Sequence, residues 1–256
     1  MSASRGLVHV HSSYSFDSST TLAEVKTLAR GKGLSFVIQT EHSNEMTLDS
    51  HRRYLEEARG LADDRFFMLP GVEYATADNR IHVLVLGVDA FWEDLRLCPA
   101  DRLVELLGRV RSAGGLSILA HPERADAIDR LPAGALGSID GIEVWNGKTD
   151  KLGPSPRGIL EAMRRRRRGE RVLALAGLDL HRPADHVPVG IEIERAPAGE
   201  SDLLAMIREA RFRIYAGPIR WDASRCGVPA ETFGRASKGA LDVARAVKRR
   251  LLRFRA

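Results

Sequence analysis

The chain has 256 residues, of which 44% are hydrophobic, and a formal net charge of +5. This is enough to bury a sizeable core in one catalytic domain, and the absence of any run of about 18 apolar residues excludes a membrane-spanning segment. The N-terminus lacks the apolar core of a secretion signal, and Cys98 and Cys226 lie far apart outside any CxxC pattern. We therefore expect a cytoplasmic protein without a disulfide framework.

The positive charge is concentrated at the C-terminus. Residues 235–256 carry eight basic residues against Asp242 alone, a net charge of +7, so the remaining body carries −2. The high pI therefore gives little evidence that the body binds nucleic acid. Apolar residues at helical spacing form a stripe in this tail, which predicts a helix docked on the body or, alternatively, bound to an acidic partner. The stripe comprises Ala240, Val243, Ala244, Val247, Leu251 and Phe254.

Short apolar runs rich in β-branched residues alternate with helical patterns along the chain. Strands are expected at residues 7–11, 35–40, 66–72, 81–87, 116–120, 141–145, 172–176, 189–193 and 212–216. Helices are expected at 21–31, 48–62, 100–113, 156–168 and 201–210, the first opening with a capping box from Thr21 to Glu24. This alternation predicts an α/β fold with a largely parallel sheet, open or closed into a barrel.

Polar residues that could bind metal begin in the first strand. In His9-Val-His11 the two imidazoles can share one face of a strand and reach one ion, although an isolated HxH could equally be structural. We expect both to lie within or near the start of the strand, and Asp17 to follow in a loop. His42 follows an apolar run, and Glu73 ends another, where an unpaired acid would be costly.

Further candidates lie on later strands. His82 sits within an apolar run, where it needs a partner, and a backbone carbonyl would serve. His121 closes a strand before Pro122. Asp179 and His181 are two residues apart after the next apolar run, so they too can share a face.

The candidates form a set that independent structural histidines would not be expected to form. Six of the eight histidines lie on or beside strands, together with three acids. Mixed imidazole and carboxylate ligands suit Zn, Mn or Fe, and nine ligands exceed the needs of one ion. We expect a cluster of two or three divalent ions held by His9, His11, Asp17, His42, Glu73, His82, His121, Asp179 and His181.

In this ordered set the chain resembles the PHP (polymerase and histidinol phosphatase) family. The matching stretches are HVHSSYSFD (9–17), TEH (40–42), GVE (71–73), His82, AHP (120–122) and GLDLH (177–181). The resemblance implies a distorted (β/α)7 barrel with up to three metals. We expect this catalytic barrel over residues 1–220 and a basic helical extension over 221–256.

The resemblance also implies a division of the ligands. One ion would be held by His9, His11, Glu73 and Asp179, a second by Glu73, His82 and His121, and the third by Asp17, His42 and His181. The family usually has an aspartate where this chain has Glu41, an acid expected to orient a ligand imidazole from behind. Arg124 and Lys148 are candidates for phosphate binding, although each could be a solvated surface charge.

The function expected from these residues is hydrolysis of a phosphoester, most simply in a small phosphorylated metabolite or nucleotide. The attacking group would be a metal-bound hydroxide, and no side chain is singled out as the leaving-group acid. One alternative is a nuclease, which would need a basic, aromatic-lined groove that the body's charge does not favour. The other is a non-catalytic regulatory module, which would be expected to have lost ligands.

Overall fold

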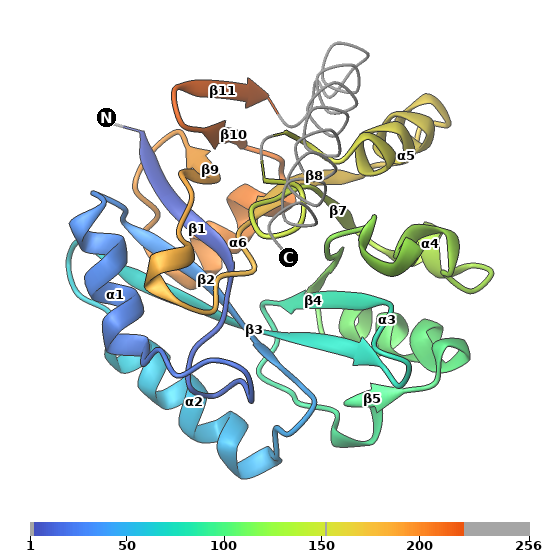
Figure 1. Cartoon of the computed structure of the whole chain (residues 1–256), viewed down its shortest axis with the longest axis horizontal. Helices are drawn as coiled ribbons and strands as arrows, with labels where there is room; N and C mark the ends of the chain where they lie inside the picture. The colour runs from blue at the N-terminus through green and yellow to red at the C-terminus, as the bar shows by residue number, and fades with distance from the viewer. Residues whose placement is uncertain (1–2, 152, 223–256) are drawn as a thin grey trace, which may run out of the picture.

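The computed structural model describes residues 3–151 and 153–222, in which strands and helices alternate (Figure 1). The strands are β1 (Ser4–Val10), β2 (Phe36–His42), β3 (Phe67–Thr76), β4 (His82–Leu86), β5 (Leu97–Cys98), β6 (Leu116–Leu119), β7 (Gly141–Asn146), β8 (Leu173–Gly177), β9 (Val189–Ile193), β10 (Phe212–Ala216) and β11 (Ile219–Asp222). The helices are α1 (Leu22–Gly31), α2 (Leu48–Gly60), α3 (Leu103–Ser112), α4 (Ala135–Ser138), α5 (Pro156–Arg167) and α6 (Glu200–Arg208). All the predicted strands and helices are present, whereas β5, β11 and α4 were not predicted.

Local sequence accounts for where helices begin. At α1 the Thr21 hydroxyl accepts from the backbone N–H of Glu24 at 3.2 Å, and the Glu24 carboxylate accepts from the Thr21 N–H at 2.7 Å. This confirms the predicted capping box. At α5, Ser155 caps the helix and Pro156 occupies the first turn, where a missing N–H costs nothing.

The strands form one sheet in the order β11-β10-β9-β1-β2-β3-β4-β6-β7-β8, with β5 beside β3. Pairing is parallel within β1-β2-β3 and within β6-β7-β8, but β4 is antiparallel to both neighbours. The ladders of β9, β10 and β11 are antiparallel as well. The prediction of a largely parallel sheet is therefore wrong at β4 and from β9 onward. The connection from β3 to β4 is too short for the crossover of a dozen or more residues that parallel strands require.

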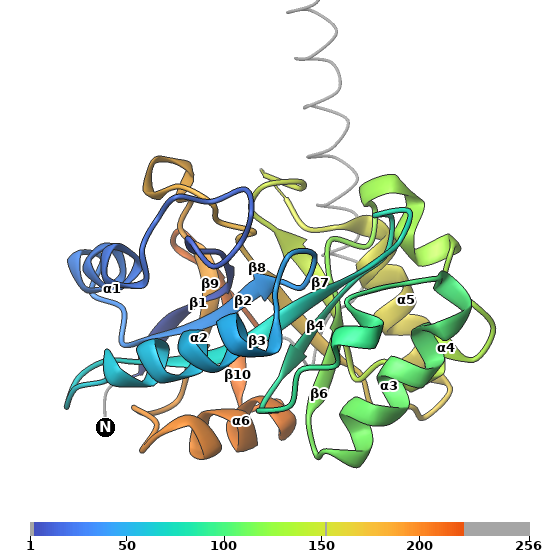
Figure 2. The same ribbon diagram turned by 90° about the horizontal axis from the view of Figure 1, so that it is seen from below.

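The sheet curls until the segment after β8 meets β1. The first half of β1 pairs with β9, but further along Val8 O accepts from the Leu178 N–H at 2.8 Å. His11 N–H then donates to Leu180 O at 2.8 Å. This closure gives an α/β barrel-like shape with helices outside, α1 and α2 on one side and α3 to α5 on the other (Figures 1 and 2). The α/β class is confirmed, and the count of seven βα units stays a prediction.

The predicted basic extension at 221–256 lies outside the described residues, apart from Trp221 and Asp222, which end β11. No helix in the described part of the chain is long and apolar enough to cross a membrane.

Candidate metal centre

The nine predicted ligands gather at one mouth of the curled sheet. They are His9 in β1, His11 and Asp17 after it, His42 at the end of β2, Glu73 in β3, His82 at the start of β4, His121 after β6, and Asp179 and His181 after β8. Because β4 is antiparallel, its first residue lies at the same end as the last residues of the parallel strands. All nine are buried except Asp17.

His9 lies within its strand, as expected, but neither His9 nor His11 lies near the strand start. β1 begins at Ser4, three residues earlier than predicted, so His9 is close to its end and His11 lies beyond it. His9 also has a φ of 61°, and the register of β1 on β2 shifts there. The two imidazoles therefore converge through a local irregularity and not through regular strand alternation.

One carboxylate oxygen of Glu73 faces the first group of ligands. Glu73 Oε2 lies 3.2 Å from His9 Nε2 and 3.3 Å from His11 Nε2. Asp179 Oδ1 lies 3.5 Å from His11 Nε2 and 3.9 Å from His9 Nε2. Two ligands at roughly 2.1 Å from one ion lie about 3–4 Å apart, so these four side chains could hold one ion.

The other oxygen of Glu73 faces a second group. Glu73 Oε1 lies 2.7 Å from His82 Nδ1 and 3.2 Å from His121 Nε2. The two oxygens of one fully buried carboxylate thus point at two different sets of imidazoles. This is the arrangement expected of a ligand that bridges two ions.

A third group surrounds Asp17. Its Oδ1 lies 3.5 Å from His42 Nε2 and its Oδ2 lies 3.0 Å from His181 Nε2. The imidazole nitrogens of His11, His42 and His181 also lie within 4.8 Å of one another. A third ion could be held here, on the exposed side of the other two groups.

The converging atoms are better placed to bind a metal ion than to hydrogen-bond to one another. Five buried atoms aimed into these groups lie close to one another but make no hydrogen bond of good geometry: His9 Nε2, His11 Nε2, His42 Nδ1, His181 Nε2 and Glu73 Oε2. Such unsatisfied atoms are rare in folded proteins. Divalent cations would satisfy them, and imidazole with carboxylate is a donor set that Zn, Mn or Fe accepts.

The electrostatics of the centre favour a cation. Burial alone would raise the pKa of Glu73, but the neighbouring His9 and His82 hold it well below its usual range. Burial lowers the pKa of His11 to about 3, helped by the charge of His42. For His42 itself burial is outweighed by Asp17 and Glu73, which raise its pKa to about 9. The proton on His42 balances the charge of these carboxylates, as a bound cation would. His11 is already the neutral imidazole that metals bind.

Glu143 is a part of the site that sequence reasoning missed. It is fully buried on β7, where its Oε1 lies 2.8 Å from His9 Nδ1. Its Oε2 accepts from the His121 backbone N–H at 2.8 Å and from Asn146 Nδ2 at 3.0 Å. The side chain is packed so closely that a Cβ added to Gly177 would overlap it. Glu143 therefore fixes two candidate ligands from behind and turns His9 Nε2 toward Glu73.

Asn79, in the turn between β3 and β4, holds His82 in a similar way. Its Oδ1 lies 2.7 Å from His82 Nε2, so Nδ1 is the nitrogen that faces Glu73. Glu41, the predicted orienting acid, contacts no imidazole directly. It accepts from the Ser15 hydroxyl at 2.5 Å, and Ser15 Oγ lies 3.2 Å from His11 Nδ1.

Backbone strain is concentrated among these residues. His9, His121 and Asp179 have φ values of 61°, 27° and 53°, a region that residues other than glycine rarely adopt. Each such residue costs on the order of 1–3 kcal/mol and persists only where its surroundings fix it. The fold thus accepts strain to bring these ligands together.

The two predicted phosphate-binding cations flank the mouth. Arg124 Nη1 lies 3.0 Å from His82 Nε2 and donates to the Asn79 carbonyl at 3.1 Å. Lys148 Nζ lies 3.2 Å from Asp179 Oδ1 and 3.3 Å from His181 Nδ1. Both line a cavity of about 70 Å³ over the centre.

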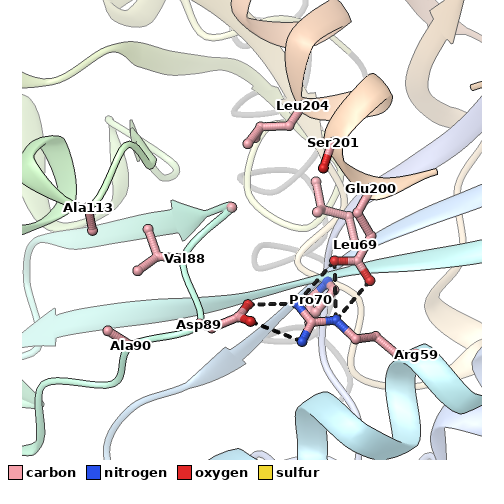
Figure 3. Close-up of a pocket in the computed structure, with 11 residues that line it drawn as sticks. Arg59, Leu69, Pro70, Val88, Asp89, Ala90, Ala113, Glu200, Ser201 and Leu204 are labelled. Carbon is pink, nitrogen blue, oxygen red and sulfur yellow. Dashed lines mark hydrogen bonds and ion pairs between the residues drawn. The ribbon is translucent and has the colours of Figure 1, made fainter. Parts of the chain in front are cut away.

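A larger cavity of about 440 Å³ lies at the opposite end of β3 and β4 (Figure 3). Its charged side chains, Arg59, Asp89 and Glu200, pair with one another, as the dashed lines in Figure 3 show. It contains no histidine. We therefore place the candidate site at the mouth and not in the larger cavity.

No protein-family model and no curated protein matches the chain. Solved structures do match its fold. One is a two-domain protein from Bacteroides vulgatus containing a predicted PHP-like metal-dependent phosphoesterase, with a TM-score of 0.61, 15% identity, and coverage of 86% of this chain and 66% of that one. Another is PsfC from Pseudomonas syringae, with a TM-score of 0.57, 16% identity, and coverage of 92% and 99%.

A third is the lesion-specific endonuclease PfuEndoQ from Pyrococcus furiosus, with a TM-score of 0.59, 16% identity, and coverage of 81% of this chain and 56% of that one. The chain thus spans less than two thirds of the Bacteroides and Pyrococcus proteins. It has the fold of a PHP-like phosphoesterase, which confirms at the level of the fold the resemblance that the sequence motifs carry.

Proposed function

We propose that the chain is a metal-dependent hydrolase that cleaves phosphoesters, built on the distorted (β/α)7 barrel of the PHP type. The observation that carries this proposal is Glu73, whose two oxygens face two separate sets of imidazoles. In the set that faces Oε2, His9 Nε2 and His11 Nε2 have no hydrogen bond of good geometry. If the only role of this mouth were to stabilise the fold, hydrophobic residues would serve better there than six imidazoles and three acids.

The proposed ligand sets follow the three groups. His9, His11, Glu73 and Asp179 would hold one ion, Glu73, His82 and His121 a second, and Asp17, His42 and His181 the third. Two or three ions of Zn, Mn or Fe, when bound, would lower the pKa of a coordinated water and neutralise charge on the phosphoryl oxygens.

The other side chains would bind and orient the substrate. Lys148 and Arg124 approach the cavity from two sides, one beside Asp179 and the other beside His82. They would hold phosphoryl oxygens between them, the arginine through its planar fork and the lysine as a point charge. Glu143 and Asn79 would keep the ligand imidazoles turned inward.

A nuclease is the second candidate, because the C-terminal tail at 235–256 carries a net charge of +7. Such a segment could bind a phosphate backbone. The low content of Phe, Trp and Tyr, which is 6% of the sequence, favours the small substrate.

Metal analysis combined with one pair of variants tests the proposal. Elemental analysis after incubation with Mn, Fe or Zn should find more than one ion per chain, and the loaded protein should hydrolyse phosphomonoesters. Glu73→Gln should lower kcat/KM more than about 100-fold because it disturbs two ions, and Asp17→Asn only about tenfold because it disturbs one. At most one ion per chain, or equal losses in the two folded variants, would contradict the cluster model.

A further inference from the structure

Phe16 lies at the mouth of the metal centre, and its ring is partly exposed to solvent. Its side chain is 54% exposed, and it lines the same cavity as Arg124 and Lys148. The ring centroid lies 5.3 Å from that of His42. In the described part of the chain, no other aromatic side chain is among the exposed large hydrophobic residues.

One exposed apolar side chain is ordinary on a protein surface, and the exposure of Phe16 alone means little. Its neighbours make it unusual. Ser15 Oγ donates to Glu41 at 2.5 Å and accepts from the His42 N–H at 2.9 Å, while Asp17 Oδ2 lies 3.0 Å from His181 Nε2. Both flanking residues are thus fixed on the metal centre, so the ring is held outward in advance of any ligand.

The size of the cavity limits what can enter. About 70 Å³ has room for a few water-sized atoms, such as the oxygens of a phosphoryl group, but not for a nucleoside. With the phosphoryl group held over the centre by Lys148 and Arg124, the leaving group has to lie outside, across the rim. At that rim the apolar surface is the face of Phe16.

We infer that Phe16 stacks on a nucleobase carried by the leaving group, so that the substrate is a nucleoside monophosphate. This rests on the proposed phosphoesterase function. Stacking on an aromatic side chain accepts any base, because every base has a π-face. The enzyme should therefore discriminate little among adenine, uracil and the other bases. It should discriminate strongly against a phosphate compound that has no base.

The test compares adenosine 5′-monophosphate with ribose 5-phosphate on the metal-loaded full chain. Both release phosphate from the same C5′ oxygen, so the reacting groups match and only the base differs. The ratio of the two kcat/KM values should favour the nucleotide. Phe16→Ala should reduce that ratio by about five- to hundredfold, the range that one stacked base contributes. Phe16→Trp should preserve it.

Val104→Ala is the matched control, because Val104 is an exposed apolar residue on α3 that does not line the cavity. It should leave the ratio unchanged. An unchanged ratio in Phe16→Ala would overturn the stacking inference and leave the phosphoesterase intact, and cleavage of oligonucleotides but not mononucleotides would also overturn it.

Failure of a metal-loaded protein to hydrolyse either compound would instead count against the proposed function. Calorimetric binding then decides the role of Phe16 separately. Adenosine monophosphate should bind the wild-type protein about five- to hundredfold more tightly than it binds Phe16→Ala. Equal binding by the two proteins would overturn the inference.

Discussion

Glu143 holds His9 and the backbone of His121 in place from outside the metal centre. Replacing it with glutamine keeps the shape but turns one acceptor into a donor, which leaves a buried N–H unpaired. Glu143→Gln should therefore weaken metal binding about 10–100-fold and lower the free energy of unfolding by roughly 1–3 kcal/mol. Chelator competition and denaturant titration measure the two effects.

Glu161→Gln on α5 is the control, since Glu161 is also a buried glutamate but contacts no candidate ligand. Equal metal affinity in the two variants would show that Glu143 does not position His9. The sequence marked Glu73 by its place in the GVE stretch, but it gave no such mark for Glu143. Both are acids inside apolar strands, and the contact of Glu143 with His9 depends on where β1 and β7 lie in the curled sheet.

At the scale of elements, α2, the segment after β4 and α6 meet at Arg59 (Figure 3). This is the end of β3 and β4 that lies away from the metal centre. The Arg59 guanidinium lies 2.6 Å from Asp89 Oδ1 and 3.0 Å from Glu200 Oε1. Because these groups are partly exposed, Arg59→Met should lower the free energy of unfolding by only about 1 kcal/mol, and less in high salt.

The matched variant is Arg52→Met, on the same helix, where the arginine's ion pair among residues 3–151 and 153–222 is an exposed one with Asp49. It should have almost no effect on stability. Metal content should be normal in both variants, because neither residue approaches the mouth. A loss of metal in Arg59→Met, or equal stability of the two proteins, would show that the three elements are joined differently.

The extent of the strands could be predicted from apolar runs, but their direction could not be read from the same pattern. A buried strand has the same composition whichever way it runs. The short link from Glu73 to His82 was the available clue to an antiparallel β4, because no helix fits between them. The irregularity at His9 had no local clue, since it arises where β1 exchanges one partner strand for another.

For the whole molecule, removal of residues 235–256 should leave hydrolysis of a nucleoside monophosphate largely intact. Every proposed ligand lies between His9 and His181, and the tail supplies one carboxylate, Asp242, and no histidine. If the substrate were a nucleic acid, losing a net charge of +7 would weaken its binding steeply and flatten its salt dependence.

The experiment compares the full chain with the truncated chain on a nucleoside monophosphate and on an oligonucleotide, across salt concentrations. Salt-sensitive oligonucleotide cleavage that disappears with the tail would favour the nuclease. A modest fall in melting temperature is compatible with the small-substrate proposal, because the apolar stripe of the tail could pack on the body.

The junction between β1 and the segment after β8 has a consequence for how the protein is made. His11 and Asp179 lie 3.5 Å apart across that junction, although about 170 residues separate them along the chain, so their contact closes a very long loop. On the ribosome, His9 and His11 emerge long before Asp179 has been made. An ion shared by the two would therefore join β1 to the segment after β8 only once residue 179 has been made, and its loss would weaken this junction.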